Sequence, residues 1–139
     1  MTLLNMIIDL PRDKPFNLHC LADCTFLSKI FADKVTELNQ ENEQDDQRPK
    51  RVINMRGHQF NEEIVHLSET KLIYQIIGNG PVKHHQGDIR YIKTKDKHYL
   101  HYRIYGQSNT WVPTWLLKLV MKYDFTLMAK RLRRAINEC

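Results

Sequence analysis

The chain is poor in the residues that mark fibrous, disordered and disulfide-rich proteins. Its 139 residues include only five glycines, five prolines and three cysteines. So little glycine and proline excludes a collagen-like or linker-dominated chain, and a hydrophobic content of 42% excludes disorder throughout. A chain of this length is the size of one ordinary domain, so we expect a single domain over residues 1–139.

Long apolar runs are also missing. The longest purely apolar segments have only a few residues, such as Trp115 to Leu117, whereas a membrane-spanning helix needs about 20. Residues 1–10 have no positively charged leader, and the cysteines at 20, 24 and 139 lack a scaffold spacing. We therefore expect no transmembrane segment, no secretion signal, reduced thiols and a cytoplasmic location.

The middle of the chain consists of short runs rich in Val, Ile, Tyr and Phe between polar segments, a pattern typical of consecutive antiparallel strands. A first short strand over residues 3–10 ends at Pro11. The later runs that we predict as strands are Val35 to Asn39, Arg51 to Met55, Gln59 to Leu67, Leu72 to Ile77, Val82 to Lys93 and Tyr99 to Tyr105. The segment Gln40 to Gln47 is acidic and has no apolar residue, so we expect a solvated loop there.

Helical spacing occurs on both sides of this region. Two short helices are predicted, one from about Asp13 to Ala22 and one over Thr25 to Phe31. After Ser108 the apolar residues return to helical period and predict one long terminal helix. Its expected buried stripe consists of Val112, Trp115, Leu116, Leu119, Tyr123, Leu127, Leu132, Ala135 and Ile136.

This order predicts an α+β fold of about seven antiparallel strands, in which the C-terminal helix can bury its apolar stripe on one face of the sheet. Short motifs recur in the same order in a known family: Ile8-Asp9-Leu10-Pro11, Leu21-Ala22-Asp23, Lys50-Arg51-Val52, Gly57, Glu62-Glu63-Ile64-Val65, Leu72-Ile73-Tyr74, Gly80-Pro81-Val82 and Gly87. With them the chain resembles the START-like (SRPBCC) superfamily, and within it the polyketide cyclase/dehydrase-like group of small single-domain proteins. The resemblance implies a helix-grip fold, in which the sheet curves around the C-terminal helix and an apolar pocket lies between them.

Aromatic residues are the candidate ligand contacts in such a pocket. A phenol pairs an apolar ring with a polar tip, so it can orient an apolar ligand that carries one or two oxygens. The candidates are Tyr74, Tyr91, Tyr102 and Tyr123, with Trp115 and Leu119 beside them on the terminal helix. We expect the chain to bind a small hydrophobic or amphipathic molecule such as a lipid, although each tyrosine alone also fits a half-buried core position.

An enzyme of cyclase or dehydrase type is the first alternative, with Glu63 or a tyrosine as the proton carrier. Glu62 and Glu63 are neighbours on one predicted strand, so one of the two must face away from the pocket. With Asp88 and Arg90 these carboxylates equally fit a salt-bridge ladder. The sequence has no nucleophile elbow, phosphate-binding glycine loop or metalloprotease helix, so the question of catalysis stays open.

We expect neither a metal nor a cofactor. The histidines His84, His85, His98 and His101 fall on two neighbouring predicted strands, but alternation leaves at most two of them on either face. A zinc site normally needs three or four protein ligands. Cys20 and Cys24 lie four residues apart on a predicted helix and fit buried free thiols better than a metal site.

The terminal helix is basic, and the whole chain has a formal net charge of +5. Its cations are Lys118, Lys122, Lys130, Arg131, Arg133 and Arg134. They would attract RNA or an anionic lipid and make a protein-interaction module the second alternative. Because stacking aromatics of an RNA-binding motif are missing, we expect no nucleic-acid partner. We expect the chain to be a monomer or a weak homodimer.

Overall fold

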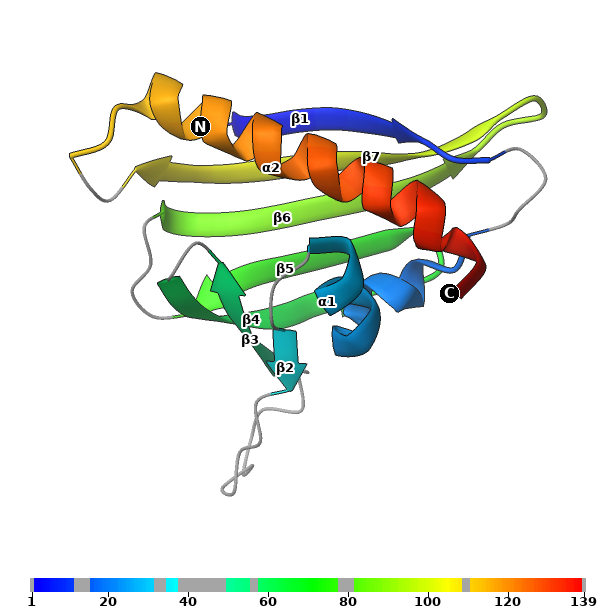
Figure 1. Cartoon of the computed structure of the whole chain (residues 1–139), viewed down its shortest axis with the longest axis horizontal. Helices are drawn as coiled ribbons and strands as arrows, with labels where there is room; N and C mark the ends of the chain where they lie inside the picture. The colour runs from blue at the N-terminus through cyan, green and yellow to red at the C-terminus, as the bar shows by residue number, and fades with distance from the viewer. Residues whose placement is uncertain are drawn as a thin grey trace.

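The computed structural model describes residues 2–11, 16–31, 35–37, 50–55, 58–77, 82–108 and 111–138 (Figure 1). Its strands are β1 (Thr2–Asp9), β2 (Val35–Glu37), β3 (Lys50–Met55), β4 (His58–Leu67), β5 (Lys71–Ile77), β6 (Val82–Lys93) and β7 (His98–Ser108). Its helices are the 3₁₀ helix η1 (Leu18–Ala22), α1 (Cys24–Phe31), α2 (Thr114–Ala135) and the 3₁₀ helix η2 (Ile136–Glu138). Among these helices, none has both the length and the apolar character needed to cross a bilayer.

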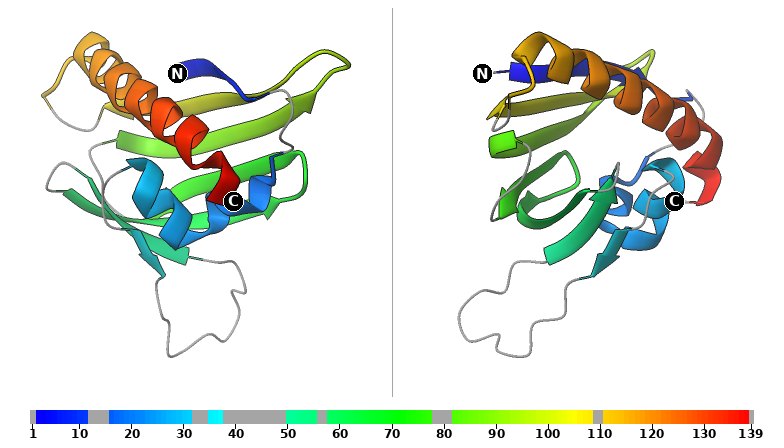
Figure 2. Two further views of the ribbon diagram at one scale, coloured as in Figure 1. Left: turned by 45° about the vertical axis from the view of Figure 1, so that its right-hand side comes forward. Right: turned by 60° about the vertical axis from the view of Figure 1, so that its left-hand side comes forward.

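The described strands form one seven-stranded sheet in the order β1-β7-β6-β5-β4-β3-β2, and all neighbours are antiparallel. The register shifts in β1, β4 and β6. Such bulges bend a strand and increase its twist, so the long strands curve out of a plane. The second view in Figure 2 shows the sheet curling around one side of the molecule.

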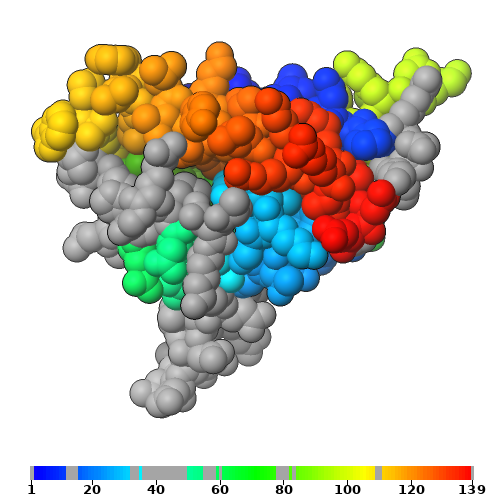
Figure 3. All heavy atoms as spheres, viewed as in Figure 1, coloured from blue at the N-terminus to red at the C-terminus, as the bar shows by residue number. Residues whose placement is uncertain are grey.

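The helices cover the concave face of this sheet. In Figure 1, α2 runs across β1 and β7, and α1 lies beside its C-terminal half over the other strands. Figure 3 shows that α2 and α1 together form the front layer of the molecule. The buried residues of α2 and η2 are Met121, Phe125, Met128, Ala129, Leu132 and Ile136.

Local sequence accounts for much of this arrangement. Asp23 begins α1 as its N-cap, because its Oδ1 accepts the backbone N–H of Thr25 at 2.8 Å. Burial alternates along β7, where Leu100, Tyr102 and Ile104 face the core and the residues between them are only partly buried. A strand with one buried and one solvated face is typical of an antiparallel sheet covered on one side.

The predicted fold class is therefore confirmed: an α+β helix-grip architecture with a curved antiparallel sheet and a long C-terminal helix. The first predicted helix is only the 3₁₀ turn Leu18–Ala22 within the described residues. The acidic segment Gln40 to Gln47, Gly57, Gly80 and the helix start near Asp13 lie outside the described residues.

The predicted buried stripe of the terminal helix is wrong in its first half. Trp115, Leu119 and Tyr123 are 67%, 59% and 62% exposed. The true inner face is rotated toward Met121 and Phe125, which are buried against the sheet and α1. The long helix carries apolar residues on both faces of its first half, so helical spacing alone did not identify the inner one.

The cysteines also differ from expectation. Cys24 is partly buried and lies outside any disulfide, as predicted. Cys20, in contrast, is disulfide-bonded, so the prediction of a free thiol at this position is wrong. The cysteine-based argument for a cytoplasmic location no longer holds, because disulfides persist mainly in oxidising compartments.

Candidate functional site

A cavity of about 150 Å³ lies between the concave face of the sheet and the helices α1 and α2. Most of its wall is apolar. The apolar residues that line it are Leu21, Leu27, Ile30, Phe31, Val35, Ile53, Ile76, Val82, Ile89, Leu100, Leu117, Val120, Met121, Phe125, Met128 and Leu132. The polar residues are Arg51, Glu62, Tyr74, His85, Tyr102 and Asp124.

An ion pair forms part of the polar wall. Arg51 on β3 and Glu62 on β4 are cross-strand partners, and both side chains are almost fully buried. The Arg51 Nη2 and Nε groups donate to Glu62 Oε1 at 3.0 and 3.2 Å, and Nη1 donates to the Leu21 carbonyl at 2.8 Å. These contacts use three of the five guanidinium N–H groups and compensate the burial of its charge.

Burial and pairing act in opposite directions on these two groups. Burial raises the pKa of Glu62, and the charge of Arg51 offsets this only in part. Burial alone lowers the pKa of Arg51, but the neighbouring Glu62 and the tyrosines raise it on balance. Arg51 therefore stays charged at the edge of an apolar space.

Two tyrosines continue the polar wall. The hydroxyl of Tyr74 on β5 lies 2.9 Å from the hydroxyl of Tyr102 on β7, and both residues are buried. The Arg51 guanidinium carbon lies 5.6 Å from the centre of the Tyr74 ring, within cation–π range. Burial raises the pKa of both phenols, so they are neutral and can each donate a hydrogen bond.

A bulge places a histidine beside these tyrosines. The register of β6 shifts between Lys83 and Gln86, and His84 has a φ of 52°, in the left-handed region that such bulges use. His84 is exposed, whereas His85 lines the cavity with its ring centre 6.1 Å from that of Tyr74. The bulge thus aims an imidazole into the apolar space.

His85 is the one member of this wall that has an unsatisfied ring atom. Its Nε2 is buried without a hydrogen-bond partner among the described residues. Burial lowers the pKa of His85 to about 4, so the ring is neutral near pH 7. A neutral imidazole offers one N–H donor and one acceptor nitrogen. A ligand oxygen at this point would therefore satisfy a group that the protein leaves unpaired.

The predicted ligand contacts divide into two groups. Tyr74 and Tyr102 line the cavity. Tyr91 does not, because its hydroxyl lies 2.7 Å from His98 Nδ1 and its ring packs edge-on against Phe16. Trp115, Leu119 and Tyr123 do not line it either, since they lie on the solvent side of α2; Leu117 and Val120 of that helix line it instead.

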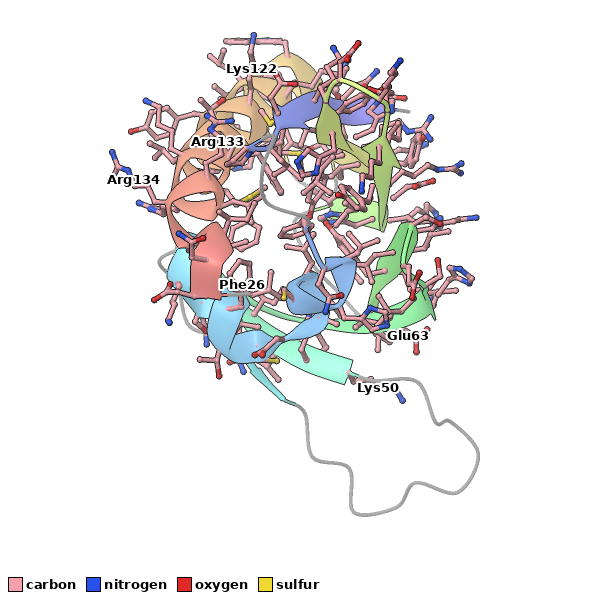
Figure 4. All side chains as sticks on the ribbon, turned by 90° about the vertical axis from the view of Figure 1, so that its right-hand side faces the viewer. Phe26, Lys50, Glu63, Lys122, Arg133 and Arg134 are labelled. Atoms are coloured by element: carbon pink, nitrogen blue, oxygen red, sulfur yellow. The ribbon has the colours of Figure 1, made fainter. Side chains whose placement is uncertain are left out.

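The predicted proton carrier also needs correction. Glu62 points into the cavity, and Glu63 accepts a hydrogen bond from Gln75 on the opposite face of the sheet, because successive strand residues alternate. In Figure 4, Glu63 lies on the outer side of the sheet, away from the helices. The glutamate pair and both histidines of the bulge were candidates from the sequence, whereas Arg51 was not predicted as a site residue. The only sequence feature that pointed to Arg51 was that it is a cation on the strand that pairs with the strand of Glu62.

The remaining singled-out polar residues lie elsewhere. Asp88 accepts from Arg90 at 3.2 Å and lies 3.8 Å from Arg103, which confirms part of the expected salt-bridge ladder. His98 contacts Tyr91, and His101 lies 2.6 Å from Asn5 Oδ1. Within the described residues, no three histidine, cysteine or acidic side chains gather in a group that could hold a metal ion.

Comparisons with known proteins identify the fold. No family model matches the sequence. No curated protein matches it closely. Solved structures do match over nearly the whole chain, at low sequence identity.

A START superfamily protein from Mycobacterium smegmatis is similar with a TM-score of 0.72 and 10% identity, over 97% of both chains. The protein XoxI from Bacillus cereus gives a TM-score of 0.69 at 10% identity, over 96% of this chain and 94% of that one. The di-domain ARO/CYC StfQ from the steffimycin biosynthetic pathway gives 0.67 at 12% identity, over 96% of this chain and 51% of that one. The resemblance predicted from the sequence is thus confirmed at the level of architecture: the chain has the START-like, polyketide cyclase-like helix-grip fold.

Proposed function

We propose that this chain binds a small hydrophobic or amphipathic molecule in the cavity between the sheet and α2. The observation that carries the proposal is the asymmetric wall of the cavity, which is mostly apolar and has convergent polar groups on β3 to β7, with Asp124 on α2. Small-molecule sites commonly combine a mostly apolar lining with a few placed polar groups that fix ligand orientation. The oxygen-bearing end of the ligand would lie at His85, Tyr74 and Tyr102.

The size of the cavity limits what fits. A dry apolar cavity of about 150 Å³ is large enough to take up benzene, so a ring-sized group fits the present volume of about 150 Å³. Leu117, Val120 and Asp124 line the cavity but are only partly buried. A longer ligand, such as a fatty acid or a multi-ring aromatic compound, would extend toward the surface beside these residues.

A matched pair of probes tests whether the polar wall of the cavity recognises a ligand oxygen. Toluene and p-cresol differ by one hydroxyl and both fit a ring-sized cavity. We expect p-cresol to bind several-fold more tightly in an NMR titration of the full chain, because a net hydrogen bond contributes about 0.5–1.5 kcal/mol. His85→Phe should reduce this preference. Equal affinity of both probes in the wild type would remove the role proposed for the polar wall.

Two tryptophan substitutions test whether the cavity is the site. Leu117→Trp adds volume on the cavity side of α2, whereas Leu119→Trp adds the same volume on its exposed side. We expect the first variant to lose p-cresol binding and the second to keep it, with both chains folded by circular dichroism. Native mass spectrometry of freshly purified protein would identify a copurified ligand. Undiminished binding by Leu117→Trp would place the site elsewhere.

A reaction of cyclase or dehydrase type is the second candidate, and the unpaired Nε2 of His85 favours it. StfQ, which shares the fold, is an ARO/CYC protein of a biosynthetic pathway. In a dehydration, His85 would accept a proton from a carbon beside a carbonyl and return it to the departing hydroxyl, which leaves as water. The Arg51 cation, held in the adjoining wall by Glu62, would polarise the carbonyl.

The two candidates differ in whether a bound molecule changes. An aromatic β-hydroxyketone incubated with the chain should lose water, as detected by mass spectrometry, if the chain is an enzyme. His85→Gln should then abolish turnover but keep binding, and His84→Gln, at the exposed neighbour, should leave both unchanged. If the β-hydroxyketone binds and is recovered intact, binding alone remains.

A further inference from the structure

The outer face of α2 and the residues just before it expose large apolar side chains that neither the core nor the cavity uses. Trp111, Trp115, Leu119 and Tyr123 are 90%, 67%, 59% and 62% exposed. We call these four residues the aromatic patch. They follow one another at intervals of four residues, so on a helix they lie along one side over roughly 12 Å from Trp115 to Tyr123. Single exposed apolar residues are ordinary, but a contiguous group marks an interaction surface.

Cations surround the aromatic patch. Lys118 and Lys122 are exposed and lie between its members along the helix. Lys130, Arg133 and Arg134 are exposed in the last turns of the same helix. Figure 4 shows Lys122, Arg133 and Arg134 pointing away from the sheet.

Acidic side chains do not offset this charge along the helix. Asp124 is the only acidic residue between Thr114 and Ala135, and it lines the cavity on the inner side. The described outer face of α2 is therefore apolar and aromatic at its start and uniformly basic toward its end. Such a face fits a partner that presents both an apolar layer and negative charge.

From this arrangement we propose that the chain docks on anionic phospholipid bilayers through the outer face of α2. Indole and phenol rings favour the headgroup level of a bilayer, because one end of each ring is apolar and the other polar. Lysine and arginine reach the lipid phosphates while their stems lie along the apolar layer. Aromatic residues beside a basic face are typical of helices that lie in the plane of the interface.

The charges argue against a second copy of this chain as the occupant. A symmetric dimer through the aromatic patch would bring Lys118 and Lys122 of both copies together, and like charges across an interface are unfavourable. An acidic protein would complement the cations, but it offers no apolar layer for Trp111, which is 90% exposed. The docking proposal does not depend on what the cavity binds.

Vesicle flotation with the full chain tests the proposal. Two preparations are compared, phosphatidylcholine alone and phosphatidylcholine mixed with phosphatidylserine. We expect the chain to float only with the mixed vesicles, with a blue shift of tryptophan emission as water leaves the indoles. Added salt should weaken binding, because it screens the cations. No flotation with the mixed vesicles would overturn the proposal.

Matched variants assign the binding to this face. Trp111→Ala/Trp115→Ala should reduce partitioning into the mixed vesicles by about tenfold or more, whereas Ile7→Ala, at a side chain of β1 that is 60% exposed, should not. Lys118→Glu/Lys122→Glu should reduce partitioning to a similar extent. Lys93→Glu/Lys95→Glu changes two exposed lysines at the end of β6 and just after it, and should reduce partitioning less. Vesicle binding that survives both α2 variants would contradict the assignment. The assignment would also be contradicted if vesicles do not bind and the aromatic patch instead forms a concentration-dependent dimer or binds an acidic protein.

Discussion

The ring of Tyr74 lies directly over Gly87 on the neighbouring strand. The two residues are cross-strand partners, and a Cβ atom added to Gly87 would lie 2.1 Å from Cε1 of Tyr74 and 2.2 Å from its Cζ. Only a residue without a side chain lets the ring lie flat against the sheet at this point. This position brings the Tyr74 hydroxyl to Tyr102 at 2.9 Å, so Gly87 helps to define the polar wall of the cavity.

Gly87→Ala should therefore destabilise the fold. The added methyl group cannot be accommodated without moving a buried ring, and such overpacking costs about 1–3 kcal/mol. Urea denaturation measures the loss. Gln86→Ala, at an exposed neighbour, should change the free energy of unfolding by no more than about 0.5 kcal/mol. In a Tyr74→Ala background the Gly87→Ala cost should shrink, and an undiminished cost would show that another contact is responsible.

The hydroxyls of Tyr74 and Tyr102 should be energetically coupled. Removing one by substitution with phenylalanine leaves the other buried hydroxyl without this partner, at a cost of about 1–3 kcal/mol. The double variant Tyr74→Phe/Tyr102→Phe should cost less than the sum of the single variants. A double-mutant cycle of urea denaturation curves gives the coupling, which we expect to be about 1 kcal/mol. Strict additivity would mean that the two hydroxyls do not interact in solution.

Breaking the Arg51–Glu62 pair should destabilise the chain more than removing both partners. Arg51→Met leaves the Glu62 carboxylate buried without its cation, a change that costs about 3–5 kcal/mol in buried pairs. Arg51→Met/Glu62→Leu should recover much of this loss, because it leaves no buried charge. Thermal and urea denaturation of the three proteins make the comparison. If the double variant is the least stable of the three, the ion pair itself stabilises the fold and does more than neutralise two buried charges.

His85 should make stability depend on pH. Its folded pKa of about 4 lies below the ordinary value of 6.5, so the unfolded chain binds a proton that the folded chain does not at intermediate pH. Stability contributed by neutral His85 is thus complete above about pH 6.5 and is lost as the pH falls toward 4. The loss is on the order of 3 kcal/mol. We expect His85→Leu to flatten this part of the curve measured by urea denaturation between pH 7 and 4, and an identical slope in the variant would contradict the burial of the ring.

The two faces of α2 should respond differently to a carboxylate. Leu132→Asp should unfold the chain, because Leu132 is fully buried and an unpaired buried carboxylate costs several kcal/mol against a typical stability of about 5–15 kcal/mol. Leu119→Asp should be tolerated, since Leu119 is 59% exposed. Melting temperatures from circular dichroism distinguish the two. Equal melting temperatures would mean that the helix is rotated in solution from the orientation described above.

The strands and helices could be predicted from the sequence because their signals are local. Runs rich in Val, Ile, Tyr and Phe between polar segments predicted β4 and β6, and helical spacing predicted α1 and α2 to within a few residues. The order of these elements then restricted the fold, since an antiparallel meander with one long amphipathic helix has few ways to bury its apolar faces. The α+β class of the chain was therefore readable from residue type and spacing, and the resemblance to the START-like superfamily added the helix-grip arrangement.

The inner face of the helix and the composition of the cavity depended on tertiary structure. The first half of α2 has apolar residues on two sides, so only docking against the sheet and α1 selected Met121 and left Trp115 exposed. Strand alternation predicted that one of Glu62 and Glu63 faces inward, but the register with Arg51 decided which one. His85 lines the cavity because of the bulge in β6, and nothing in the sequence predicted the left-handed backbone conformation of His84 in that bulge. Local spacing determines periodicity, whereas phase and register are set by contacts between residues far apart in the chain, and those contacts exist only once the sheet has closed over its helices.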